Sequence, residues 1–144
     1  METVGDPDRL RQIVGNLVSN AVTHTPPGTP VHVRVGIAPA GEAGGVDRSG
    51  RVGAAPAFPE GTPLSDLEVA DEGPGLAAHQ AQRIFERFFR VDPSRSRDRG
   101  GSGLGLAIAA AIARGHNGRL EVDTAPGRGC TFRLLLEARP VTGR

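Results

Sequence analysis

Four glycines stand close together at residues 100–105, in the stretch GGSGLG, directly before an apolar, alanine-rich helix pattern. Glycine is unfavourable inside a helix, so such a cluster indicates that a ligand or another backbone approaches closely. Two familiar phosphate loops are excluded, because no Lys-Ser/Thr pair follows Gly105 and because G-x-G-x-G is not the dinucleotide spacing. A phosphate loop of another design and a flexible linker both stay open.

Three amide side chains, Gln12, Asn16 and Asn20, follow one another at intervals of four residues in the first predicted helix. Side chains at that interval form one row on a helix surface. The row is consistent with surface amides in solvent. It is also consistent with carboxamide oxygens that complete the coordination shell of Mg²⁺, because this hard cation binds oxygen ligands, including those of phosphates. The second interpretation predicts that this row and the glycine cluster face one cleft.

Asp71 stands where an apolar strand pattern ends, in the stretch DEGPGL. Asp and Gly favour tight turns without any ligand. A carboxylate at this position could instead accept a hydrogen bond from an exocyclic amine such as the adenine N6, with Gly73 and Gly75 leaving room beside it.

The stretch RIFERFFRVD, residues 83–92, combines three phenylalanines with arginines at helical spacing. The phenylalanines predict that this segment docks on another part of the chain. The arginines fit a solvated helix face, and Arg87 and Arg90 also fit guanidinium groups that point at phosphates.

The apolar periodicity around these motifs predicts three helices and four strands. Asp6 is the expected N-cap of the first helix, with Pro7 at the first helical position. The predicted helices are 6–25, 77–89 and 104–114, and the predicted strands are 31–37, 64–70, 119–123 and 130–136. The expected buried face of the first helix is Leu10, Ile13, Val14, Leu17, Val18, Ala21 and Val22, and that of the first strand is Val31, Val33, Val35 and Ile37.

Residues 39–63 are mostly Gly, Ala, Pro and small polar residues. Such a segment buries too little apolar surface to order itself, so we expect a long, mobile hairpin connection. Strands that follow one another through turns favour hairpins. The expected fold is therefore an α/β two-layer sandwich, with helices on one face of a mixed, mostly antiparallel sheet.

The composition of the 144-residue chain indicates one domain without a membrane span, because no run of 18 apolar residues occurs. The single cysteine and the lack of a signal-peptide core predict a cytoplasmic setting. A net charge of +1 gives no indication of nucleic-acid or membrane binding. All 17 basic residues are arginines, so any cationic phosphate contact must use arginine.

Taken in order, NLVSNAVTHTP, DEGPG, IFERFFR and GGSGLGLAI resemble the N, G1, F and G2 boxes of sensor histidine kinases. The closing GHNGRLEVDTAPGRGCTFRLLL is similar to the last two strands of that family, so the resemblance runs over residues 6–136. It implies the ATP-binding catalytic domain of a two-component sensor kinase. It also implies the Bergerat α/β sandwich shared with gyrase-type topoisomerases and Hsp90-type chaperones.

The resemblance also implies roles for individual residues. Asn20 would ligate Mg²⁺, with Asn16 beside it near the phosphates, and Asp71 would bind adenine. Gly73 and Gly75 would pack against the base, and Arg87 or Arg90 would approach the γ-phosphate. Residues 76–102 would form an ATP lid, residues 1–5 a linker and residues 137–144 a tail. The other residues that the resemblance assigns to ATP are Thr23, His24, Gly101, Ser102, Gly103, Leu104, Gly105, Leu106 and Thr131.

The chain departs from the family pattern at Thr23 and His24, where many members carry lysine and an aromatic residue. His24 could stack near the nucleotide or pack at the helix end. None of the four histidines has the context of a phosphoacceptor. The expected partner is therefore a separate dimerisation and phosphoacceptor domain of the same membrane-anchored kinase, with a response regulator acting indirectly and the isolated domain a monomer.

Three functions stay open at this point. The first is phosphotransfer from ATP to a histidine. The second is ATP hydrolysis of the gyrase or chaperone type, in which a glutamate stands one turn before the magnesium asparagine; here Asn16 takes that position, and an amide cannot act as a general base. The third is a degenerate domain that binds nucleotide only to signal to a partner.

Overall fold

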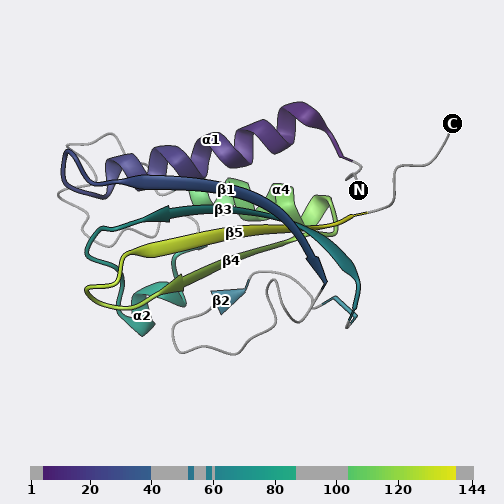
Figure 1. Cartoon of the computed structure of the whole chain (residues 1–144). Helices are drawn as coiled ribbons and strands as arrows, with labels where there is room; N and C mark the ends of the chain where they lie inside the picture. The colour runs from purple at the N-terminus through teal and green to yellow at the C-terminus, as the bar shows by residue number, and fades with distance from the viewer. Residues whose placement is uncertain (1–4, 40–51, 54–57, 60, 87–103, 139–144) are drawn as a thin grey trace, which may run out of the picture.

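Five strands form one sheet in the order β1-β3-β5-β4-β2, and all four of its pairings are antiparallel (Figure 1). The strands are β1 (Val31–Pro39), β2 (Val52–Gly53), β3 (Pro63–Asp71), β4 (Arg119–Thr124) and β5 (Cys130–Glu137). The helices are α1 (Pro7–Thr23), α2 (Ala78–Ala81) and α4 (Gly105–Gly115). This computed structural model describes residues 5–39, 52–53, 58–59, 61–86 and 104–138.

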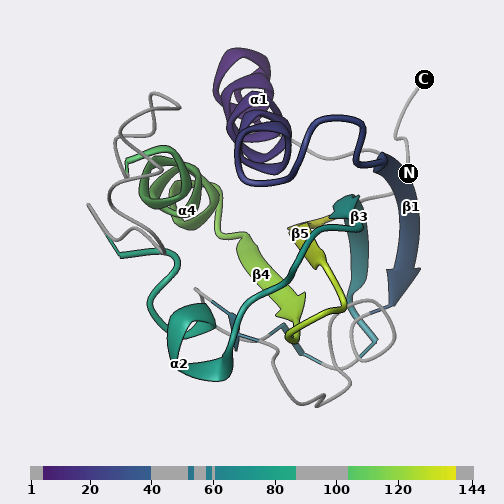
Figure 2. The ribbon, with the colours of Figure 1, turned by 90° about the vertical axis from the view of Figure 1, so that its left-hand side faces the viewer.

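Helices α1 and α4 lie side by side on one face of the sheet, which gives the two-layer sandwich that the sequence predicts (Figure 2). Asp6 caps α1 as expected, because its carboxylate accepts hydrogen bonds from the backbone N–H groups of Asp8 and Arg9. Between the layers, Ile13 and Leu17 of α1 are fully buried with Phe132 of β5. The described helices include none that is long and apolar enough to cross a membrane.

The first helix and the first strand bury less than predicted. Val22 of α1 is exposed, and so are Val33, Val35 and Ile37 of β1, so the expectation that all of these residues face the core is wrong. Val31 does pack against the core, whereas Val33, Val35 and Ile37 do not. The physical reason is that β1 is an edge strand, with a neighbour on one side only among the described strands.

The helix predicted for residues 77–89 is also different in the structure. Within the described part of this range, residues 77–86, only the four residues of α2 are helical, and turns follow as far as Glu86. There Arg83 N–H donates to the Gln80 carbonyl and Glu86 N–H to the Arg83 carbonyl, which is the tighter spacing of turns. The turns let Phe85 pack edge-to-face on Phe132, with ring centroids 6.2 Å apart, so the predicted docking of this segment is confirmed for Phe85.

The described residues of the predicted 39–63 connection include a short strand. Within it, β2 pairs with β4, and Phe58 packs on Leu64 and Leu135 at the face of the sheet opposite the helices. The predicted tail also starts too early, because Ala138 is buried and donates its N–H to the Pro63 carbonyl.

The face of the sheet opposite the helices carries a row of charges. Arg133 of β5 donates to Glu68 of β3 at 2.7 Å, and Arg119 donates to the fully buried Glu121 of β4 at 2.6 Å. Asp66 lies in the same row. Burial, and then the negative charge of Glu68, raises the pKa of Asp66 to about 6, although the charge of Arg133 opposes this shift.

Candidate functional site

The amide row of α1 meets the start of α4. Asn16 is half-buried, and its side-chain N–H donates to the backbone carbonyl of Gly105 at 3.0 Å. This hydrogen bond uses only the amide nitrogen, so the Asn16 Oδ1 atom is left as an acceptor. Asn20, one turn further along the row, is also half-buried, whereas Gln12 is exposed. The structure therefore brings Asn16 and Gly105 together, as the sequence predicts.

The first residues of α4 differ in what they expose. Leu104 is the N-cap residue of the helix, and its own side chain makes no capping hydrogen bond. A Cβ at Gly105 would meet no heavy atom within 4 Å, so among the described residues packing does not require glycine there. The Leu106 side chain is buried in the core, so only its backbone is available to a ligand.

The carboxylate of Asp71 is held at the end of β3 by two backbone groups. Its Oδ1 atom accepts from the N–H of Gly73 at 2.8 Å and from the N–H of Cys130 at 3.3 Å. Both bonds go to the same oxygen, and no described residue donates to Oδ2. The side chain is half-buried, and the two bonds hold its carboxylate in one orientation.

Gly73 and Gly75 are required by packing within the chain. A Cβ on Gly73 would lie 2.6 Å from Cγ2 of Thr25 and 2.9 Å from Asp71 Oδ1. Gly75 has φ +73°, and a Cβ there would collide with the carbonyl oxygen of Ala125. The close approach that sequence analysis attributed to a ligand is therefore made, in these two places, by the chain itself. Contact with a nucleotide base stays a prediction.

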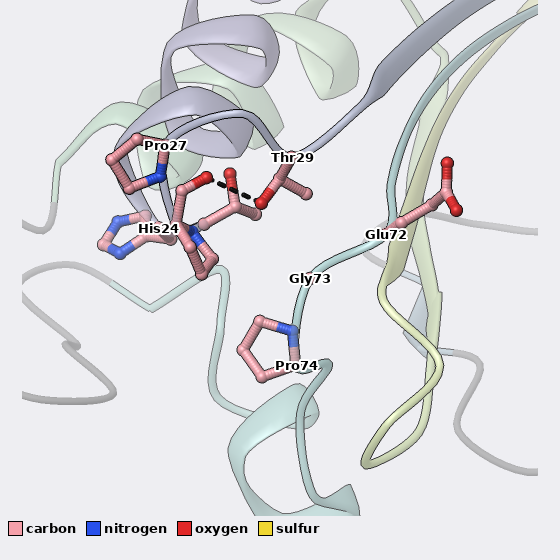
Figure 3. A pocket seen from close by; sticks show the side chains of 8 residues that line it. His24, Pro27, Thr29, Glu72, Gly73 and Pro74 are labelled. Atoms are coloured by element: carbon pink, nitrogen blue, oxygen red, sulfur yellow. Dashed lines mark hydrogen bonds between the residues drawn. The ribbon is translucent and has the colours of Figure 1, made fainter.

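An open cavity of about 540 Å³ lies between the loop that follows α1 and the turn after Asp71. Figure 3 shows His24 and Pro27 on one side of it and Gly73 and Pro74 on the other. The Glu72 side chain points away from the cavity, in keeping with its contact of 3.3 Å with His32 on β1. His24 thus lies at the wall of this cavity, at the end of α1, with an exposed side chain.

Thr131 is not placed where the sequence analysis put it. Side chains alternate along β5, and both Cys130 and Phe132 belong to the core under the helices. Thr131 shares the opposite face with Arg133, so its side chain points away from the helix layer, and this placement does not support its assignment to the nucleotide. Cys130 takes the position beside Asp71, and burial raises the pKa of its thiol to about 11.

Two threonines that sequence analysis missed hold the site together. Thr25 is buried, donates its hydroxyl to the Ala21 carbonyl at 2.7 Å, and packs its methyl group against Gly73. Thr124 accepts from the N–H of Leu76 at 3.0 Å and donates to the Gly129 carbonyl at 2.7 Å. The available signal was a threonine at the last position of the predicted helix 6–25 for Thr25, and a threonine at a strand end for Thr124.

The remaining predicted residues divide into two groups. Thr23, the last residue of α1, is half-buried next to His24. The others lie outside the described residues; they are Arg87, Arg90, Gly101, Ser102 and Gly103.

Residues 5–140 match the sequence profile of the family described as "Histidine kinase-, DNA gyrase B-, and HSP90-like ATPase". Among curated relatives, the sensor-like histidine kinase SenX3 of Mycolicibacterium smegmatis is 38% identical over 95% of this chain and 30% of its own length. The probable sensor histidine kinase TcrY of Mycobacterium tuberculosis is 40% identical over 85% of this chain and 21% of its own. The chain thus spans less than a third of these relatives.

Solved structures give the same result for the fold. The mycobacterial sensor histidine kinase MprB superimposes with a TM-score of 0.67 at 31% identity, covering 96% of this chain and 76% of that one. Full-length ShkA in complex with AMPPNP superimposes with a TM-score of 0.63 at 28% identity, covering 96% of this chain and 24% of that one. Together with the geometry of the amide row, the glycine turn and α4, these matches place the chain in the family of histidine kinase-, DNA gyrase B- and HSP90-like ATPases, as the ATP-binding domain found in its sensor histidine kinases.

Proposed function

We propose that this domain binds Mg-ATP and donates the γ-phosphate to a histidine on a separate phosphoacceptor domain of the same kinase. The observation that carries the proposal is the contact between Asn16 and Gly105, because it joins the predicted metal-binding row to the predicted phosphate-binding backbone. The AMPPNP in the ShkA complex adds support, since that protein shares the fold.

The base end of the site would be Asp71. Its Oδ1 atom is occupied by two backbone N–H groups, so the carboxylate cannot rotate freely. Its Oδ2 atom would accept a hydrogen bond from the exocyclic amine of adenine. A base that offers a carbonyl oxygen at that position would be rejected, because two acceptors would then face each other.

The phosphate end would be the start of α4 and the amide row. Backbone N–H groups at the first turn of a helix attract anions, and the N-cap residue of α4, Leu104, has no polar side chain that could cap them. Asn20 would coordinate Mg²⁺ through its amide oxygen, beside Asn16. These residues fit the ion, because Mg²⁺ accepts neutral oxygen ligands when phosphates supply the charge, and the ion would neutralise the charge that develops on the phosphates.

The main role of the domain in phosphoryl transfer would be to hold ATP in the reactive orientation. In the transfer, the bond between the γ-phosphorus and the bridging oxygen breaks, a bond to the acceptor imidazole nitrogen forms, and ADP leaves. A hydrolase would need a general base that deprotonates the attacking water, and the amide of Asn16 at that position is not basic. Arg87 or Arg90 would approach the γ-phosphate, and the response regulator would receive the phosphoryl group afterwards. We also propose that the domain acts in the cytoplasm.

A reconstitution with γ-labelled ATP tests the proposal. The domain is mixed with the phosphoacceptor domain of the full-length kinase, and acid-labile, base-stable label on the acceptor is measured with and without Mg²⁺. We expect label on the acceptor, little on this chain, and none for Asn20→Ala. Fast release of free phosphate without label on the acceptor would identify a hydrolase instead. Binding of ATP with neither product would identify a nucleotide-dependent signalling module.

A further inference from the structure

Strand β1 presents an apolar stripe to solvent. Three of its side chains are large and exposed, with Val33 at 51%, Val35 at 74% and Ile37 at 50% of full exposure. They alternate along the strand, so all three point to the same face of the sheet as α1. Singly exposed valines are common on protein surfaces, but three in a row on one strand form a patch.

The same strand leaves its backbone available along one side. All nine residues of β1 pair with β3, and β1 is the last strand of the sheet on that side. No strand within the described ranges pairs with its outer edge. A long edge strand with an apolar face is a template for pairing with another strand, because its N–H and C=O groups still need partners.

The residue pattern of β1 is complementary to itself. In an antiparallel pair of two copies centred on Val35, Val35 lies opposite Val35, and Val33 lies opposite Ile37 of the other copy. All three apolar residues of each strand then meet apolar partners. Arg34 lies opposite Gly36, and each Arg34 stays beside Glu68 of its own chain, 3.9 Å away, which offsets its charge.

Neighbouring registers fit less well. Centring the pair on Arg34 places two arginines directly opposite each other, and like charges in that position are destabilising. Centring it on Gly36 leaves Val31 without a partner in the other β1, whereas all nine residues of β1 pair when the centre is Val35. Hydrophobic pattern and charge therefore select the register about Val35.

We propose that β1 is a self-association edge, at which two copies of this domain pair antiparallel about Val35. A two-fold axis through that point places both helix layers on the same side of one continuous sheet. The apolar stripes of the two copies then form one surface between the two α1 helices. Because α4 lies on the other side of each domain from β1, the contact between Asn16 and Gly105 stays open to a ligand (Figure 2). This association differs from the monomer expected from the sequence, and it does not depend on the proposed function.

Sedimentation equilibrium of the purified chain over a wide concentration range tests the association. We expect a reversible monomer–dimer equilibrium without larger species. Val35→Lys should raise the dimer dissociation constant by about tenfold or more, because it places two lysines opposite each other. Ile108→Lys, at an exposed position of α4, is the control and should leave the constant unchanged. A monomer at every concentration, larger aggregates, or equal effects of the two variants would each overturn the proposal.

Disulfide trapping tests the register without relying on a disruptive variant. In a Cys130→Ser background, Val35→Cys should form a disulfide-linked dimer under mild oxidation, because the two positions lie opposite each other. Val33→Cys alone should not, whereas a mixture of Val33→Cys and Ile37→Cys chains should. Circular dichroism checks that each variant is folded. Failure of Val35→Cys to cross-link, or cross-linking of Val33→Cys to itself, would refute the pairing about Val35.

Discussion

Asn16 and Gly105 are 89 residues apart in the sequence, and a hydrogen bond of 3.0 Å joins the side-chain amide of one to the backbone carbonyl of the other. The bond ties the middle of α1 to the first residue of α4. It therefore fixes the distance between the row that would bind the metal ion and the backbone that would bind phosphate. Substituting each of these two residues gives a separate prediction.

Replacing Asn16 by alanine removes the bond and leaves the Gly105 carbonyl without this donor. We expect Asn16→Ala to lower the free energy of unfolding by about 1 kcal/mol. It should also weaken MgATP binding by about tenfold or more, since the amide is lost from the phosphate end. Urea denaturation and titration calorimetry measure the two effects. Gln12→Ala, one turn earlier and exposed, is the matched control, and an equal loss of affinity in that variant would contradict the assignment.

Replacing Gly105 by alanine separates stability from binding. No heavy atom lies within 4 Å of a Cβ at Gly105 in the described structure, so alanine fits there. Because alanine favours a helix more than glycine does, we expect Gly105→Ala to be neutral or stabilising by up to about 1 kcal/mol. MgATP affinity should fall, because the methyl group occupies the space that a phosphate needs. Unchanged affinity would show that bare backbone at Gly105 serves no ligand.

The sequence predicted where helices and strands begin and end better than it predicted their burial and their order in the sheet. The Asp6 cap, the end of β3 at Asp71 and the start of α4 depend on local spacing, and each is confirmed. The exposure of Val35 could not be predicted, because an alternating pattern is the same in an edge strand and in a central one. The order of strands, which makes β1 the edge, depends on pairings between distant residues.

The site shows the same division. The meeting of Asn16 with Gly105 was predicted from the motifs, whereas the face that Thr131 occupies was not. The phase of alternation in β5 is fixed by its register with β3, where Cys130 pairs with Asp71. The contact of Phe85 with Phe132 could not be predicted either, because it joins residues that are far apart in the sequence.

Asp71 gives a prediction about base selectivity. In Asp71→Asn, one atom can still accept from Gly73 and Cys130, and the other becomes an N–H group that faces the adenine amine. We expect ATP affinity to fall by about tenfold to a hundredfold, with a small change in stability. Competition binding with ATP and GTP measures it. Glu72→Gln, next in sequence and exposed, is the control, and the assignment fails if both variants bind ATP alike.

Alanine substitutions at Gly75 and at Gly15 should change the free energy of unfolding in opposite directions. Gly75 combines φ +73° with a Cβ position blocked by the Ala125 carbonyl, so Gly75→Ala should destabilise the fold by about 2 kcal/mol or more. Gly15 lies inside α1 with no heavy atom near its Cβ position, so Gly15→Ala should stabilise by about 0.5–1 kcal/mol. Denaturant midpoints measure both. A stable Gly75→Ala protein would contradict the packing of this turn.

The charged face of the sheet makes the stability depend on pH. The pKa of Asp66 is raised to about 6 in the fold, whereas an unfolded aspartate has a pKa of about 3.9. Between these values the folded chain holds the proton more tightly, so the free energy of unfolding falls as pH rises through this window. Above pH ~6 the buried carboxylate is charged beside Glu68, at a cost of about 1–2 kcal/mol after allowance for partial exposure.

Asp66→Asn removes this charge, so it should be more stable than the parent at pH ~8 and about equally stable at pH ~4. Urea denaturation of both proteins across this range gives the difference curve. Asp8→Asn, at an exposed position, controls for the loss of a carboxylate, and a flat difference curve for Asp66→Asn would show that this group carries no penalty in the fold.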